Sequence, residues 1–419
     1  MDSGSTAFII ICAALVFIMT PGLGFFYGGL GRRKNVVSNM MNSVFIMGLG
    51  MVLWALLGYT ISFGGDAAGH GGFIIGGFNH IGLSGITSDT LDFNGTTDNS
   101  IPAFVFCAFQ MMFAIITPAI ITGSLAGRMK FKALFFFIAI WSIVVYYPMA
   151  HMVWGDNGIL GVDHLGSVDF AGGNVVHVAS GVSGLVLCML LGRRHGYENQ
   201  SYRTHNIPFI MLGMGLLWLG WFGFNAGSAL EANGQAAHAF MTTAISAATA
   251  LLSWMLMDVI VGKKATLIGA STGAIVGLVG ITPGAGFVPI WAAFIIGALV
   301  SPTCYFGIVV IKRRLMLDDA LDAFGCHGIG GIFGGLMTGL FAQSAVGGTD
   351  GLFFGNPWLV GKQFVAIIVS IAVAAAGSLI CASIVKLFTP LRVARKNELM
   401  GLDISEHGEN AYPSYMGLD

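Results

Sequence analysis

The hydrophobic positions fall into eleven long runs separated by shorter polar connections. Each run holds roughly 20 mostly apolar residues, the length that an α-helix needs to cross the hydrocarbon core of a bilayer. The runs lie near 6–31, 38–64, 101–127, 133–153, 170–192, 207–230, 236–261, 265–283, 287–311, 324–346 and 360–389. The pattern predicts an all-α polytopic membrane protein with eleven transmembrane helices.

Basic residues occupy every second connection and the tail, which indicates the direction of each span. The intervening connections at 65–100, 154–169, 231–235, 284–286 and 347–358 contain no Lys or Arg, and of the 19 basic residues only Lys362 departs from the alternation. Since short loops rich in Lys and Arg stay in the cytoplasm, we expect the N-terminus outside and the C-terminus inside.

Composition supports the membrane assignment. Hydrophobic residues make up 55% of the chain and charged residues 9%, whereas a soluble domain carries about 25% charged residues. Lipid must therefore replace water around much of the surface. The 62 glycines suit close helix packing in a bilayer. The net charge of −1 argues against a nucleic-acid partner.

The cysteines and the N-terminus give no indication of a disulfide framework, a metal site or a cleaved signal peptide. All six cysteines lie in apolar runs and none forms a CxxC pair, so we expect buried free thiols: Cys12, Cys107, Cys188, Cys304, Cys326 and Cys381. No basic segment precedes the first run, which predicts a retained helix rather than a cleaved signal peptide. With no nucleophile–base set, metal-spaced cluster or phosphate loop, we expect no enzyme activity, metal or cofactor.

Two similarities between the halves of the chain predict an inverted repeat. The segment GFFYGG (24–29) in span 1 resembles GFNAGS (223–228) in span 6. An Asp shortly before a His recurs in spans 5 and 10, and Gly follows each His four and seven positions later. Two halves of five spans have opposite topology, and such repeats place the transport pathway at their interface. We expect halves at about 6–192 and 207–346, with span 11 apart.

The Asp–His pairs are Asp169 with His177 and Asp322 with His327. Ionisable residues inside spans are costly and indicate function. At 1.5 Å per residue, His177 lies about 24 Å above Arg193 and His327 about 20 Å above Arg314. The similar depth favours a histidine pair in a pathway, and the alternative is two separate core histidines. Six other histidines lie in loops or the tail, where we expect them to be solvated: His70, His80, His164, His195, His205 and His407.

The same depth scale orders four further residues. Trp154 and Ser228 fall about 33–37 Å above the cytoplasmic clusters, at an outer mouth, and Phe224 about 32 Å and Phe113 about 22 Å above them. A Trp face attracts cations, a Ser hydroxyl accepts a hydrogen bond, and phenyl rings exclude hydrated ions. Each aromatic could instead face lipid or pack in the core, and spacing alone does not choose among the 32 phenylalanines.

Six motifs resemble those of the ammonium transporter (Amt/Rh/MEP) family and follow its order along essentially the whole chain. They are FYGGL (26–30), FQMMF (109–113), AHMVW (150–154), DFAGGNVVH (169–177), GWFGFNAGS (220–228) and DAFGCHG (322–328). The prokaryotic Amt branch is the better match, because Rh proteins usually lack a Trp at the position of Trp154.

The resemblance implies a homotrimer in the plasma membrane in which each subunit has its own ammonium pore. It implies a recruitment site of Trp154, Ser228 and Phe109, a phenyl gate of Phe113 and Phe224, and a twin-histidine pair, His177 and His327. Asp169, and Asp322 by analogy, are expected to be structural or electrostatic residues. For Asp169 a helix cap is favoured over direct contact with the cation.

The C-terminal residues also match the family. The segment GLDISEHGENAY (401–412) resembles the tail of prokaryotic Amt proteins, which implies subunit coupling and docking of a trimeric PII signal protein, together with the basic loop 193–205. The alternative is a disordered tail. We therefore expect a transmembrane domain over 1–389, with span 11 at about 360–389, and a regulatory tail over 390–419.

The function implied is ammonium uptake, in which NH4+ loses a proton and NH3 crosses a dry segment, with or without a separate proton relay. Two alternatives stay open. One is an ammonium sensor or transceptor, and the other is a neutral NH3/CO2 gas channel of Rh type.

Overall fold

The computed structural model describes residues 1–65, 71–91, 101–198 and 204–412. These residues form helices and turns, with two isolated β-bridges. The helices are α1 (Ser3–Leu30), α2 (Val36–Leu53), α3 (Tyr59–Phe63), α4 (Ala103–Leu125), α5 (Phe131–Trp141), α6 (Tyr147–Trp154), α7 (Ala179–Leu191), α8 (Ile207–Gly227), α9 (Gly234–Ile260), α10 (Leu267–Ile281), α11 (Ile290–Val309), α12 (Ile329–Phe341), α13 (Ser344–Gly347), α14 (Trp358–Lys386) and α15 (Arg395–Met400).

Eleven helical segments of the described chain are long and apolar enough to cross a membrane, as the sequence predicts. Several are continued by π-helical turns. One turn joins α2 to α3, another joins α5 to α6, and two more precede α7 and α12. The largest differences from the predicted bounds are at the start of the second span, observed at 33 and predicted at 38, and at the end of the tenth, observed at 341 and predicted at 346. His70, expected above in a loop, and residues 199–203 of the basic loop lie outside the described residues.

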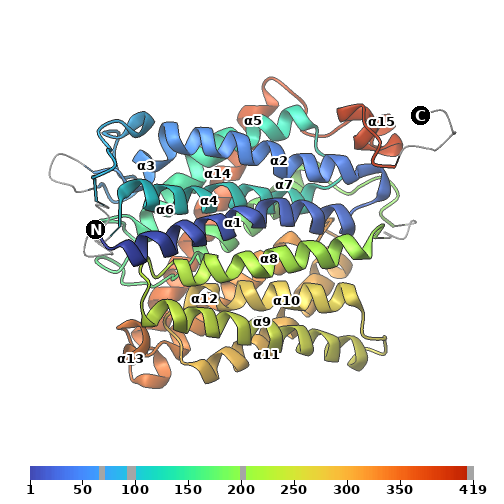
Figure 1. The fold of residues 1–419 in the computed structure, drawn as a ribbon. Coiled ribbons are helices and arrows are strands. Elements are labelled where there is room, and N and C mark those ends of the chain that lie inside the picture. Colours follow the sequence, from blue (N-terminus) through green and yellow to red (C-terminus); the bar gives the residue numbers. More distant parts are fainter. Residues whose placement is uncertain (66–70, 92–100, 199–203, 413–419) are drawn as a thin grey trace.

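The spans form one bundle in which the two halves of the chain lie side by side (Figure 1). Helices of the first half occupy one part of the bundle, helices α8–α12 the other, and α1 lies against α8 along the junction. The first spans of the two halves run in opposite directions (Figure 1). Helix α14 packs against α5, α7 and α12, so span 11 contacts both halves.

Glycine residues allow the backbones of α1 and α8 to pack in direct contact. A Cβ added to Gly213 would lie 2.6 Å from the carbonyl oxygen of Gly22, and a Cβ added to Gly22 would lie 2.9 Å from Cβ of Leu216. Both distances are too short for non-bonded atoms. Because packing rather than the hydrophobic effect holds helices together in lipid, these glycines explain how the two halves form one tight contact.

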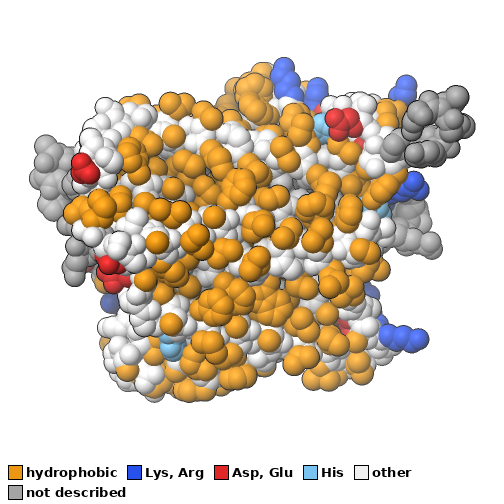
Figure 2. Space-filling view, viewed as in Figure 1, with side chains coloured by type: hydrophobic (Ala, Val, Ile, Leu, Met, Phe, Trp, Pro, Cys, Tyr) orange, Lys and Arg blue, Asp and Glu red, His pale blue; other side chains and the backbone are white. Residues whose placement is uncertain are grey.

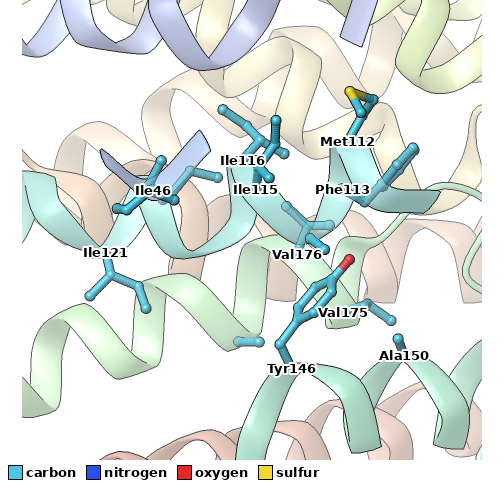
Figure 3. Packing of buried hydrophobic residues seen from close by; sticks show 14 of the residues in the cluster. Ile46, Met112, Phe113, Ile115, Ile116, Ile121, Tyr146, Ala150, Val175 and Val176 are labelled. Carbon is cyan, nitrogen blue, oxygen red and sulfur yellow. The ribbon is translucent and has the colours of Figure 1, made fainter. Parts of the chain in front are cut away.

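The interior of the first half is apolar and closely packed (Figure 3). Residues of α4 meet the helical turn that precedes α7, and the labelled side chains include Met112, Phe113, Ile115, Ile116, Ile121, Tyr146, Val175 and Val176. These side chains are almost fully buried. The packing fixes the position of α4 relative to the segment that carries His177.

The outer surface fits a bilayer. Hydrophobic side chains cover the flank of the bundle, and Lys and Arg gather toward the end where α15 lies (Figure 2). The N-terminus and the C-terminal tail lie at opposite ends (Figure 1), as an odd number of spans requires.

The tail is folded onto the bundle up to Tyr412. Asp403 Oδ1 accepts a hydrogen bond from the Ser38 amide at the start of α2 (2.9 Å), and Glu406 Oε2 accepts one from the Phe131 amide at the start of α5 (3.0 Å). Two tail carboxylates thus bind helix N-termini, where amide groups lack intrahelical partners. The tail residues 395–412 therefore lie against the cytoplasmic ends of α2 and α5 predicted from sequence.

Candidate functional site

The two histidines meet at the junction of the halves. His177 lies in the π-helical turn Gly173–Val178 and His327 in the turn Phe324–Gly328. Their Nδ1 atoms are 3.2 Å apart, and the residues are 1% and 5% exposed. In such a contact one Nδ1 donates its proton and the other accepts it, so the two rings must carry complementary tautomers.

The backbone brings the histidine-bearing turns together through a glycine. A Cβ on Gly181 would lie 2.6 Å from Cα of Gly328. Gly181 is the glycine four positions after His177, as the sequence analysis noted. The close approach explains why two residues 150 positions apart share one hydrogen bond.

Aromatic rings lie beside the histidine pair. The rings of Phe113 and Phe224 are stacked, with centroids 4.2 Å apart and an interplanar angle of 29°. The His177 ring lies 6.2 Å from Phe224 and 5.3 Å from Trp221, nearly parallel to both. Phe113 comes from α4 and Phe224 from α8, so the stacked pair also joins the two halves.

A cavity lies on each side of the Phe113–Phe224 pair. The larger, of about 490 Å³, includes Phe113, Trp154, Asp169 and Ser228 in its wall, and we call it the outer cavity. The smaller, of about 20 Å³, is lined by Phe224, the two histidines, Asp322 and mostly apolar side chains, and we call it the inner cavity. It has room for about one water molecule. The stacked rings therefore separate a wide polar space from a narrow apolar one.

Hydrogen bonds fix the polar groups of the outer cavity. Trp154 donates its indole N–H to the carbonyl of Asp169 (2.8 Å), and its ring meets Phe113 edge to face at 5.8 Å. Ser228 donates its hydroxyl proton to the carbonyl of Phe224 (2.8 Å). Phe109 does not contribute to the wall of this cavity. It is fully buried and packs against Phe113 with centroids 5.0 Å apart.

The Asp169 carboxylate binds the backbone at the start of span 5. It accepts hydrogen bonds from the amides of Gly172 (2.9 Å), Gly173 (2.6 Å) and Asn174 (2.7 Å). Burial raises the pKa of this carboxyl, and the amide hydrogen bonds partly oppose that change. These contacts are those of the helix cap that the sequence analysis favoured.

In the second half, the residue that corresponds to Asp169 is Asp319. The prediction that Asp322 corresponds to Asp169 is wrong. Asp319 accepts from the amides of Ala323 (3.2 Å), Phe324 (2.9 Å) and Gly325 (3.2 Å). It precedes His327 by eight positions, as Asp169 precedes His177. Asp322 instead forms an ion pair with Lys312 (2.6 Å) and has a left-handed φ of 60°. It lines the inner cavity.

Sequence reasoning also missed two polar residues of the site region. His151 is 1% exposed, and its ring nitrogens lie 2.8 Å from the Ser62 carbonyl and 2.5 Å from the Gly72 carbonyl. Gln110 lies in the wall of the outer cavity. His151 lies in the motif AHMVW and Gln110 in the motif FQMMF. A polar side chain inside an apolar span was the feature that could have identified them.

Within the described residues, eleven apolar helices, an inner cavity lined by both halves and a buried histidine pair between them define a multi-pass membrane protein. Residues 7–412 match the model of the Ammonium Transporter Family, and the chain belongs to this family.

Similar proteins agree with the family assignment. The chain is 46% identical to an ammonium transporter of Bacillus subtilis, and the match covers 99% of this chain and 100% of the relative. It is 42% identical to the ammonium transporter Amt1 of Archaeoglobus fulgidus, and that match covers 98% of this chain and 100% of the relative. The crystal structure of Saccharomyces cerevisiae Mep2 matches with a TM-score of 0.88 and 33% identity, covering 99% of this chain and 93% of that one. The protein is a membrane transporter of ammonium rather than an enzyme.

Proposed function

We propose that the outer cavity recruits ammonium and that ammonia crosses the phenyl pair and the histidine pair. The observation that carries this proposal is the order of the groups: the Trp154 face and the Ser228 oxygen, then the Phe113–Phe224 stack, then His177 and His327. An indole face attracts a cation, and the Ser228 oxygen, whose proton is already donated, offers only lone pairs.

The inner cavity favours ammonia over ammonium. Its wall is mostly apolar, and moving a bare cation into such surroundings costs many kcal/mol. Ammonium can avoid this cost by leaving its proton behind, whereas potassium has no proton to lose. Selectivity then comes from acid–base chemistry rather than from size. A neutral imidazole has one protonated and one free ring nitrogen, so the hydrogen-bonded pair of His177 and His327 can accept the released proton and relay it separately.

We infer a homotrimer in the plasma membrane, with the N-terminus outside and a cytoplasmic face that binds a PII-type signal protein. The family resemblance supports the trimer and the partner. The folded tail supports a docking role, because its backbone is held in a defined position against α2 and α5.

A second candidate function is ammonium sensing. A structure titled "Sensor Amt Protein" matches with a TM-score of 0.86 and 26% identity, covering 96% of this chain and 98% of that one. The same fold therefore serves a protein described as a sensor, which would bind ammonium without sustained passage.

The test is the current across a solid-supported membrane carrying purified protein after an ammonium pulse. We expect a transient current with ammonium and none with potassium. In His177→Ala and His327→Ala we expect the current to fall at least about tenfold, because a positioned proton acceptor contributes about 10²–10⁴-fold to such steps. An unchanged current in both variants would contradict the relay.

Absence of current in the wild type would leave two alternatives, which the internal pH of the same vesicles separates. A rise in internal pH after the pulse would indicate neutral passage of ammonia, as in a gas channel of Rh type. No change in pH would indicate a sensor.

A further inference from the structure

Gln110 is a buried polar residue whose role the mechanism above leaves open. It lies on α4 between Phe106 and Phe113, at spacings of four and three residues that place all three on one face of the helix. All three contribute to the wall of the outer cavity. Gln110 is 8% exposed, and its side-chain oxygen has no hydrogen-bond partner within the described part of the protein.

A buried amide oxygen without a partner is costly, and it calls for an explanation in a native structure. The last torsion of a Gln side chain is broad and nearly two-fold. The carbonyl can therefore turn toward the outer cavity without displacing the helix.

Two polar groups in the same cavity wall have already used their donors. Trp154 has donated its N–H to the Asp169 carbonyl, and Ser228 has donated its hydroxyl proton to the Phe224 carbonyl. The Asp169 carboxylate is itself occupied by three backbone amides. What Trp154 and Ser228 offer to the cavity is an aromatic face and oxygen lone pairs. This arrangement suits a small cation with several N–H groups.

We propose that the Gln110 carbonyl accepts a hydrogen bond from the ammonium ion held between Trp154 and Ser228, and so helps to determine specificity at the recruitment site. The inference rests on the proposed function. Ammonium has four N–H groups in a tetrahedral arrangement, so it can bind Ser228, Gln110 and the indole face from different sides. Methylammonium has one N–H fewer, and potassium has none.

The expected effect is on recruitment and not on passage, since Gln110 belongs to the outer cavity and is absent from the wall of the inner one. Gln110→Leu keeps the approximate volume and removes the acceptor. We expect it to raise the half-saturating ammonium concentration about tenfold, in line with a hydrogen bond to a charged group. The maximal current should stay within about twofold of wild type. The preference for ammonium over methylammonium should also decrease.

The experiment compares currents over a range of ammonium and methylammonium concentrations in four proteins. They are the wild type, Gln110→Leu, Gln110→Glu and Gln235→Leu. Gln110→Glu restores acceptor oxygens at the same position, so its half-saturating concentration should be no higher than that of the wild type. Gln235 also lines the outer cavity, but its amide nitrogen donates to the Gly286 carbonyl (3.0 Å). Gln235→Leu therefore controls for a general loss of polarity.

Three results would overturn the inference: an unchanged half-saturating concentration in Gln110→Leu, equal shifts in the two Leu variants, or a Gln110→Glu protein as weak as Gln110→Leu. If Gln110→Leu does not insert into the membrane, the Glu variant still decides, since a tenfold weaker response there contradicts the proposal. A wild type that does not respond to ammonium would instead contradict the proposed function, so the two failures are distinguishable.

Discussion

Two buried carboxylates hold the histidine-bearing turns in place. Asp169 and Asp319 each accept three backbone amide hydrogen bonds at the start of spans 5 and 10, and Asp319 also accepts one from the Ser124 hydroxyl (2.6 Å). Burial raises the pKa of Asp319. Each carboxylate precedes its histidine by eight residues, so the caps fix the position of both imidazoles in the wall of the inner cavity.

Asp319→Asn is expected to destabilise the protein, whereas Asp322→Asn is the matched control. The amide side chain has one acceptor oxygen and places an NH2 group against backbone N–H donors, so the buried network breaks at a cost of about 1–3 kcal/mol. The Asp322 side chain is 31% exposed in its ion pair with Lys312, and a partly exposed pair contributes only about 0–1 kcal/mol. Thermal unfolding of both variants in detergent measures the difference. Equal losses would contradict the assignment of Asp319 as the cap.

The histidine pair could be predicted from sequence because depth along a helix follows directly from residue count. The residue of the second half that corresponds to Asp169 could not be predicted in this way. Asp322 lies nearer to His327 in sequence, but it stands in a left-handed turn, as Gly172 does in the first half, and its carboxylate pairs with Lys312 instead of with backbone amides. A single sequence does not reveal such a turn. Nor does it show that Phe109 packs behind Phe113 rather than in the cavity wall.

At the scale of elements, side chains of the tail accept hydrogen bonds from backbone amides at the start of two spans, where no intrahelical acceptor is available. Helix α2 begins without a side-chain cap of its own, and so does α5. Asp403 and Glu406 provide carboxylates for these helix starts. A carboxylate at a helix N-terminus is favourable both as a hydrogen-bond acceptor and as a charge near the positive end of the helix dipole.

Docking of the tail is expected to weaken as the pH falls below about 6.5. His407 packs against the ring of Phe131, with centroids 4.9 Å apart, and burial lowers its pKa from the ordinary value of 6.5, although Asp403, Glu406 and Glu409 oppose the shift. A base with a lowered pKa stabilises the docked state above the free pKa, and this contribution is lost as the ring becomes protonated. The hydrogen-exchange protection factors of residues 395–412, which divide out the intrinsic pH dependence of exchange, should therefore be lower at pH 5.5 than at pH 7.5.

The control for this pH effect is His407→Gln, which cannot take up a proton. Its tail should exchange at rates that change less between the two pH values, after correction for the intrinsic pH dependence of exchange. The same pH dependence in wild type and variant would mean that another group is responsible.

For the whole molecule, the number and approximate bounds of the spans could be predicted because the bilayer allows few alternatives to an apolar helix of about 20 residues. The π-helical turns at His177 and His327 could not be predicted, since their hydrogen-bond register depends on packing between spans. The relation of the two halves was visible in short glycine motifs and in the Asp–His pairs that recur in spans 5 and 10. Those motifs matter because they mark contacts, as at Gly181.

The orientation in the membrane can be measured with thiol labelling. All six native cysteines are buried, so an impermeant maleimide should give little background in intact cells. Val162→Cys, at a residue that is 73% exposed, is expected to label in intact cells if the N-terminus lies outside. Lys264→Cys is expected to label only after the cells are permeabilised. The reverse pattern would contradict the predicted topology.

The glycine contact between α1 and α8 also constrains the order of biogenesis. Gly22 enters the bilayer early in synthesis, but its neighbours Gly213 and Leu216 follow much later. At about 5–20 residues per second, the roughly 190 residues between the two glycines take about 10–40 s to emerge from the ribosome. During that interval α1 lies in the membrane without its contact to α8. The inner cavity, which both halves line, therefore forms only after more than half of the chain has been translated.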